Sequence, residues 1–184
     1  MKNPKKILII IQRSNGDVFL SLSLIKSLYD YYNFPRIDLL VNDDTLTVAK
    51  LLPHINFIYT FSYQKKLDRR WNQEKEIITN IYRKYDLSIN LTASDRSVIY
   101  ALLAGKKSIS AIEKDNRKSW WKKSLLTYHY FFDVTKHILC NNLEPLNLLK
   151  IQHKTACPKI SYLYPVNPVY PCKFKKCHNL NLFS

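Results

Sequence analysis

The chain contains very little glycine: Gly16 and Gly105 are the only two among 184 residues. A dinucleotide-binding turn needs three spaced glycines, and a Walker loop needs two followed by lysine, so both motifs are excluded. In such a glycine-poor chain, we expect the remaining glycines to lie where the backbone needs their freedom. Gly16 falls in a turn after a β-branched run, and Gly105 at the end of a helical pattern.

Long hydrophobic runs are also absent. Apolar residues make up 46% of the chain, which is enough for a core. The apolar run at residues 7–11 is far shorter than the roughly 18 to 20 residues that a membrane span needs. Gln12 and Arg13 interrupt this run, and no small-residue cleavage site follows it, so we predict no secretory signal. A cytoplasmic location is the expectation.

The cysteines do not form a recognised metal-binding pattern. Without a secretory signal, reduced thiols are expected at Cys140, Cys157, Cys172 and Cys177. Two of them lie close to His178, but no C-x-x-C pair is present. We therefore predict neither a metal site nor a cofactor.

Acidic residues are scarce, with 14 Asp and Glu against 29 Lys and Arg, and the formal net charge is +15. Two explanations remain open. A lysine-rich background composition raises the charge without any partner. Alternatively, the protein binds an anionic partner, such as a phosphorylated lipid or sugar, a membrane face, or nucleic acid.

The apolar pattern alternates between strand-like and helix-like segments. It predicts an α/β fold, a Rossmann-like parallel sheet with helices on both faces. The expected strands are residues 5–11, 37–41, 55–61, 86–92 and 107–112, and the expected helices are residues 17–33, 44–52, 67–85, 95–104 and 136–150. We expect residues 1–163 to form this domain and residues 164–184 to be an irregular tail or linker.

The first strand-to-helix turn, Arg13 to Asp17, is the strongest candidate for a site. In open α/β sheets, ligands bind beyond the carboxyl ends of the strands, and free N–H groups at a helix N-terminus attract anions. Asp17 at the start of the helix has two interpretations. It can cap the helix and complement its dipole, or it can carry chemistry.

Three blocks of sequence resemble one known family. Residues 5–41 (KKILIIIQRSNGDV onward), 85–111 and 137–150 are similar to glycosyltransferase family 9, the heptosyltransferases. The resemblance implies one half of a GT-B architecture, with inverting transfer and no metal. It also implies that Asp17 is the base for the acceptor hydroxyl, and that Ser14, Asn15 and Gly16 lie close to the acceptor or the donor phosphate.

The resemblance further implies two partners, a phosphorylated lipopolysaccharide acceptor and a nucleotide-sugar donor such as ADP-heptose. The family's donor-side motifs, a Pro-Gly turn and an Asp-x-Gly-x-x-His loop, do not occur in this sequence. We therefore expect an acceptor-side domain from a truncated chain that lacks the donor domain, with donor binding only if a second domain is supplied. The alternative is an inactive orphan α/β domain that binds anions.

Basic clusters supply the remaining candidates for substrate binding. Residues 106–123 hold seven basic residues against two acids, interleaved with two tryptophans. This segment is interpreted as a solvated face, as a surface for phosphorylated acceptor or peripheral membrane contact, or as a nucleic-acid surface. Because no nucleic-acid-binding signature is present, we do not expect the last. The candidates are Lys65, Lys66, Arg69, Arg96, Lys118 and Lys122.

Overall fold

A parallel sheet of six strands lies at the centre of the computed structural model, which describes residues 4–65, 67–114 and 120–152. The strand order is β3-β2-β1-β4-β5-β6, and every pair is parallel. This arrangement confirms the predicted Rossmann-like α/β fold. The strands are β1 (Lys6–Ile11), β2 (Arg36–Asn42), β3 (Ile55–Phe61), β4 (Tyr85–Asn90), β5 (Gly105–Ile112) and β6 (Tyr128–Phe131).

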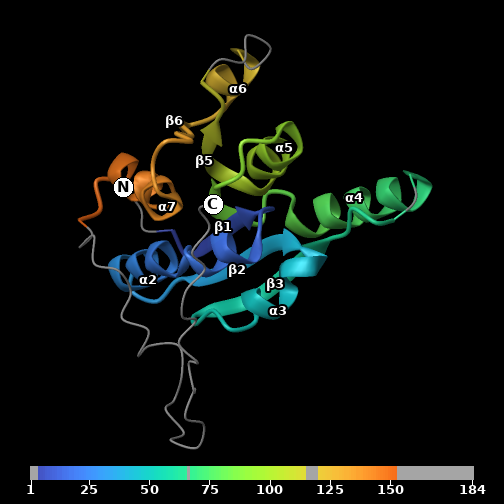
Figure 1. Cartoon of the computed structure of the whole chain (residues 1–184), viewed down its shortest axis with the longest axis horizontal. Helices are drawn as coiled ribbons and strands as arrows, with labels where there is room; N and C mark the ends of the chain where they lie inside the picture. The colour runs from blue at the N-terminus through green and yellow to red at the C-terminus, as the bar shows by residue number, and fades with distance from the viewer. Residues whose placement is uncertain (1–3, 66, 115–119, 153–184) are drawn as a thin grey trace, which may run out of the picture.

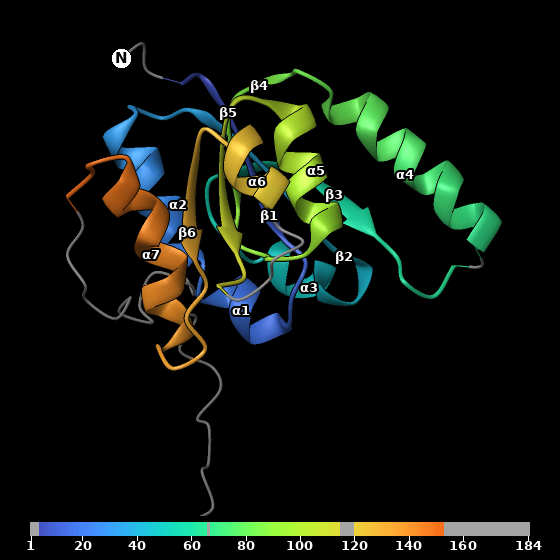
Figure 2. The ribbon, with the colours of Figure 1, turned by 90° about the horizontal axis from the view of Figure 1, so that it is seen from above.

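Helices cover both faces of the sheet, as Figures 1 and 2 show. One face carries α2 and α7, and the other carries α4 and α5. The helical segments are α1 (Asn15–Phe19), α2 (Leu22–Tyr31), the 3₁₀ turn η1 (Asp43–Thr45), α3 (Leu46–Ala49), α4 (Leu67–Ile81), α5 (Asp95–Ala104), α6 (Trp120–Leu125) and α7 (Ile138–Leu148). The amino-terminal end of α4 projects away from the rest of the fold in both views.

The central strand β1 shows why the core has two sides. Its alternate residues Ile7, Ile9 and Ile11 pack on the α2/α7 side, whereas Leu8 and Ile10 pack on the α4/α5 side. Successive side chains of a strand point to opposite faces. A strand buried on both faces is therefore apolar throughout, as this one is.

The strand order reverses between β1 and β4, which lie side by side although they are far apart in sequence. The turns that follow these two strands meet at the carboxyl edge of the sheet. The Gln12 backbone N–H donates to Oγ1 of Thr92 at 2.9 Å and ties the turns together. Ligands of open α/β sheets bind at such a switch point.

Two elements differ clearly from the sequence prediction, and a third agrees with it. The expected helix 17–33 is two helices, because Ser21 Oγ donates to the Val18 carbonyl at 2.6 Å and Leu20 and Ser21 form a turn between them. Strand β6 was not predicted, since its four residues show no alternating pattern. The expected helix 136–150 is confirmed as α7, which accommodates Pro145 in its interior.

The glycine expectation is wrong. Neither glycine has a positive φ, whereas Asn33, Phe34, His54, Arg83 and Lys150 all do. Glycine is needed at position 105 because a Cβ does not fit there, and not because of its backbone conformation. A Cβ there would lie 2.6 Å from Ser88 Oγ and from the Lys107 carbonyl oxygen. At Gly16 a Cβ would meet only Ser14 Oγ, at 3.9 Å, so nothing in the described structure excludes a side chain there.

Several predictions lie outside the described residues. They concern the end of the expected domain 1–163, the expected tail 164–184, Lys66, Lys118, and Cys157 with the cysteines that follow it. No helix among residues 4–65, 67–114 and 120–152 is long and apolar enough to cross a membrane.

Candidate functional site

The turn after β1 holds Asp17 in a dense set of contacts. Ser14 is the N-cap of α1, and with Asp17 it forms a reciprocal capping box. Asp17 Oδ2 accepts from the Ser14 N–H at 3.3 Å, from Ser14 Oγ at 3.1 Å and from Arg13 Nε at 3.0 Å. Among the described residues, no hydrogen bond reaches Oδ1. The carboxylate is therefore fixed through one oxygen, and its side chain is 17% exposed.

Arg13 joins this turn to a large open pocket. Its guanidinium lies 4.3 Å from the centre of the Phe132 ring, a cation–π contact, and it lines an open pocket of about 1070 Å³. The other lining residues are Ala93, Glu113, Lys114, Tyr130, Phe131, Phe132, Asp133, Val134, Lys136 and Glu144. We call this space the edge pocket, because its walls are the segments that follow β1, β4, β5 and β6, together with the end of β6 and Glu144 of α7.

Charges in the edge pocket are balanced. Three cationic side chains (Arg13, Lys114, Lys136) face three carboxylates (Glu113, Asp133, Glu144). Thr135 donates to Asp133 Oδ1 through its hydroxyl at 2.6 Å and its N–H at 2.9 Å. These hydrogen bonds hold the pKa of Asp133 below its ordinary value.

The floor of the pocket contains a buried phenol. Burial raises the pKa of Tyr130, the Glu144 carboxylate adds to that rise, and Arg13 opposes it. The Tyr130 hydroxyl therefore stays protonated and can act as a hydrogen-bond donor. The pocket thus combines donors, acceptors and aromatic faces.

The turn and α7 are held together directly. Asn142 Nδ2 donates to the Asp17 carbonyl oxygen at 3.4 Å, and Asn141 Nδ2 donates to the Asp133 carbonyl oxygen at 2.9 Å. Both amides are buried. They fix the loop that carries Asp133 and Lys136 relative to the turn that carries Asp17.

The structure brings only part of the predicted set together. Ser14, Asn15 and Gly16 are exposed in the same turn as Asp17. Lys65 and Arg69 lie at the projecting end of α4 and do not line the edge pocket. Arg96 pairs with Glu74 Oε1 at 3.0 Å on the α4/α5 side.

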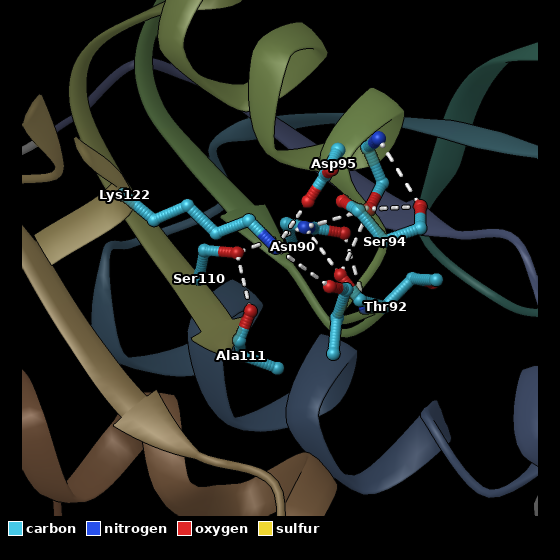
Figure 3. Close-up of polar contacts among 9 residues, drawn as sticks. Asn90, Thr92, Ser94, Asp95, Ser110, Ala111 and Lys122 are labelled. Atoms are coloured by element: carbon cyan, nitrogen blue, oxygen red, sulfur yellow. Dashed lines mark hydrogen bonds and ion pairs between the residues drawn. The ribbon is translucent and has the colours of Figure 1, made fainter. Parts of the chain in front are cut away.

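Lys122 does not face the edge pocket, contrary to its expected role in substrate binding. Its side chain is 1% exposed, and Nζ lies 2.5 Å from Asp95 Oδ1 and 3.3 Å from the Ala93 carbonyl oxygen. Figure 3 shows the side chain reaching toward the Thr92–Asp95 turn. The buried ammonium therefore binds protein groups and joins α6 to the N-terminus of α5.

Beneath that turn, Asn90 organises a polar network, which Figure 3 also draws. Asn90 Nδ2 donates to the Thr92 carbonyl at 2.6 Å, to Ser97 Oγ at 3.0 Å and to Ser110 Oγ at 2.8 Å. Because Thr92 also accepts from Gln12, the network fixes the switch point from the β4 side.

Sequence reasoning missed most of the edge pocket. Arg13 was noted as interrupting an apolar run and as the first residue of the candidate turn, but not as a binding residue, and Lys136 and Glu144 were not singled out. The available signal was the position of Arg13, four residues before an acid at a helix start, which allows an i,i+4 ion pair. Among the described residues, no group of His, Cys, Asp or Glu is placed to hold a metal ion.

Comparisons with known proteins point to one group. The chain is 31% identical over 155 residues to lipopolysaccharide heptosyltransferase 3 of Escherichia coli K12, covering 82% of this chain and 44% of the relative. It therefore spans less than half the length of the curated relatives it matches. No protein-family model matches it.

Solved structures agree on the fold. A glycosyl transferase family 9 protein from Veillonella parvula superimposes with a TM-score of 0.66 at 18% identity, covering 80% of this chain and 42% of that one. Escherichia coli heptosyltransferase WaaC with ADP-2-deoxy-2-fluoro heptose gives a TM-score of 0.65 at 12% identity, covering 83% and 50%.

Proposed function

Because the chain belongs to the heptosyltransferase-like proteins of glycosyltransferase family 9, we propose that it provides the acceptor side of an inverting sugar transfer. The acceptor is a phosphorylated lipopolysaccharide core sugar, and it binds in the edge pocket. The donor is a nucleotide-sugar, as in the WaaC structure with an ADP-heptose analogue. The sequence lacks the family's donor-side motifs, so donor binding needs a second domain.

The composition of the edge pocket carries this proposal. Sugar hydroxyls both donate and accept hydrogen bonds, and three carboxylates with three cations satisfy both needs. The apolar face of a sugar ring can pack on Phe131 or Phe132. A site for a simple anion would instead have an excess of positive charge, which the edge pocket does not have.

Asp17 is suited to act as the base. Arg13 and Ser14 hold Oδ2, which leaves Oδ1 to receive the proton of the acceptor hydroxyl. The acceptor oxygen then forms a bond to the anomeric carbon. The bond from that carbon to the donor phosphate oxygen breaks, and its electron pair leaves with the nucleoside diphosphate. A single displacement of this kind inverts the anomeric centre.

Gly16 also supports the placement of a ligand at the turn that carries Asp17. Neither φ nor space requires glycine at this position, so its use is best explained by a ligand that approaches the backbone closely. The exposed N–H side of the turn is where the phosphate of a donor or acceptor would lie.

Basic and aromatic residues that lie outside the edge pocket have a separate role in this proposal. Lys65 and Arg69 are exposed at the projecting end of α4. Trp120 is 72% exposed on α6, and Lys123 Nζ lies 5.3 Å from the Phe131 ring. Exposed tryptophan beside lysine is typical of contact with an anionic lipid surface. We place the protein at the inner face of the cytoplasmic membrane, with these groups toward the lipid phosphates.

Titration calorimetry with a de-acylated, phosphorylated core oligosaccharide tests acceptor binding. We expect Arg13→Gln to weaken binding by about tenfold, which corresponds to the loss of one charge-assisted hydrogen bond. Asp30→Asn is the matched control, because Asp30 forms an exposed i,i+4 pair with Lys26 on α2, at 3.0 Å. This control should bind as the wild type does.

A DNA oligonucleotide of equal charge tests the anion-binding alternative. Equal affinity for both ligands, with the same salt dependence and no effect of Arg13→Gln or Asp17→Asn, would contradict the acceptor proposal. It would support the orphan anion-binding domain instead.

A further inference from the structure

Gln12 is buried at the switch point with its amide unpaired. The residue is 6% exposed, and neither Nε2 nor Oε1 has a hydrogen-bond partner among the described residues. Its backbone is fixed, since the N–H donates to Thr92 Oγ1 at 2.9 Å. A buried amide without partners is unfavourable, and folded proteins rarely retain one without a reason.

Asn42, the last residue of β2, also has a buried polar atom without a hydrogen-bond partner. It is 8% exposed, and its Oδ1 is buried without a partner among the described residues. Ile11 and Val41 are partners in the β1–β2 register, so Gln12 and Asn42 follow as neighbours. Successive side chains of a strand point to opposite faces of the sheet. Gln12 and Asn42 therefore lie on the α4/α5 side, where Ile10 and Leu40 pack. The unpaired amide of Gln12 and the unpaired Oδ1 of Asn42 therefore lie next to each other at the carboxyl edge of the sheet.

An aromatic ring and an arginine border the two amides. Asn42 pairs in register with Phe61 of β3. The Arg96 guanidinium lies 4.4 Å from the centre of the Phe61 ring and 5.2 Å from that of Tyr63. Arg96 comes from α5 and pairs with Glu74 of α4.

The chemistry of the unpaired atoms selects the ligand. Of the unpaired atoms of Gln12 and Asn42, Gln12 Oε1 and Asn42 Oδ1 only accept hydrogen bonds, while Gln12 Nε2 only donates. The buried Tyr100 hydroxyl, in the core cluster on the same side, is also unpaired among the described residues. A phosphate oxygen cannot donate to the two acceptors. A hydroxyl group both donates and accepts, so neighbouring hydroxyls of a sugar satisfy the set.

We propose that Gln12 and Asn42 form a second subsite, on the α4/α5 side of the sheet edge, that binds hydroxyl groups of a sugar. The identification of the sugar as part of the acceptor rests on the proposed function. The edge pocket begins at the adjacent residue, Arg13. An acceptor of more than one sugar unit can therefore contact both sites across the same turn.

The stability of Gln12→Leu gives the first test. Leucine fills the space without polar atoms, so we expect the melting midpoint to rise by about 2 °C or more. Gln73→Leu is the matched control. Gln73 is equally buried on the same side of the sheet, but its Oε1 accepts from the Ser62 N–H at 3.2 Å and its Nε2 donates to the Ser62 carbonyl at 3.3 Å. Its replacement should lower the midpoint.

Calorimetry of the same variants with the de-acylated core oligosaccharide gives the second test. We expect Gln12→Leu to weaken binding about tenfold despite its higher stability. A midpoint that stays constant or falls would overturn the inference, because the amide would then be satisfied by water or protein. A higher midpoint with unchanged affinity would also overturn it.

A third variant separates this inference from the proposed function. Phe132→Leu changes the edge pocket and the neighbouring core on the α2/α7 side, whereas Gln12 and Asn42 lie on the α4/α5 side. If it weakens binding while Gln12→Leu does not, the acceptor proposal stands and the second subsite is wrong. If the oligosaccharide does not bind the wild-type chain at all, both are wrong.

Discussion

The buried ion pair between Lys122 and Asp95 predicts an asymmetric response to mutation. Lys122 is 1% exposed, whereas Asp95 is 71% exposed. Removing the acid leaves an ammonium in the interior whose remaining contacts among the described residues are the Ala93 carbonyl, at 3.3 Å, and the Trp121 ring, at 5.8 Å. Removing the lysine leaves a hydrated carboxylate in the first turn of α5, where the helix dipole favours it.

Coulomb's law gives the strength of the attraction between the Lys122 and Asp95 charges. At 2.5 Å, the attraction is about 7 kcal/mol at an effective dielectric constant of about 20, and about 2 kcal/mol in bulk water. Because Asp95 is mostly exposed, the lower part of this range applies. We expect Asp95→Asn to reduce the free energy of unfolding by about 2 to 3 kcal/mol. Lys122→Met keeps the apolar stem, and we expect it to cost less than about 1 kcal/mol.

Urea denaturation of both single variants and of the double variant measures these effects. The double variant should cost no more than Lys122→Met alone, because the asparagine no longer faces a buried charge. If Lys122→Met costs more than Asp95→Asn, the ammonium contributes favourable interactions of its own. The assignment of Lys122 as a buried charge compensated by Asp95 would then be refuted.

Four further predictions concern residues outside the site or at its edge. Lys150→Gly should raise the free energy of unfolding by about 1 kcal/mol in urea denaturation, since Lys150 adopts φ 57° after α7. Gly105→Ala should lower the thermal midpoint, because a Cβ would lie 2.6 Å from Ser88 Oγ, whereas Gly16→Ala should leave it unchanged or higher and weaken only ligand binding. Tyr85→Phe should cost about 1 to 3 kcal/mol in urea denaturation, because its hydroxyl donates at 2.7 Å to the buried carboxylate of Asp38. Lys106 and the backbone N–H groups of Lys5 and Lys6 lower the pKa of Asp86 below its ordinary 3.8. Asp86 therefore stabilises the fold above about pH 4, and this contribution is lost as the pH falls further. Asp86→Asn should lower the thermal midpoint at pH 7 but not at pH 2.

Strand β1 could be predicted because its burial on both faces demands a continuous apolar run. The expected bounds of α5 are confirmed, since Ser94 caps it and accepts from the Ser97 N–H. Strand β6 could not be predicted, because it is an edge strand of four residues whose exposure alternates irregularly. The break near Ser21 depends on one side-chain hydrogen bond that competes with the backbone, which periodicity does not reveal.

The site was harder to predict than the fold. The position of Asp17 at the carboxyl edge follows from the strand-to-helix order alone. The edge pocket does not, because its walls come from segments near the ends of four different strands and from α7, which the fold brings together. The basic residues misled in one respect. Lys122 lies in a surface-like pattern, yet its ammonium is in the interior, where a single carboxylate reaches it.

Intermolecular NOEs between the de-acylated core oligosaccharide and the isotope-labelled chain test the central claim most directly. If the edge pocket holds the acceptor, sugar protons will show NOEs to the rings of Phe131 and Phe132, and the Arg13 Nε–H resonance will shift on titration. Trp71, which is 62% exposed on α4, marks the projecting part of the fold away from the edge pocket. Saturable binding with NOEs confined to Trp71 and the projecting end of α4, and no change at Arg13, would contradict the account.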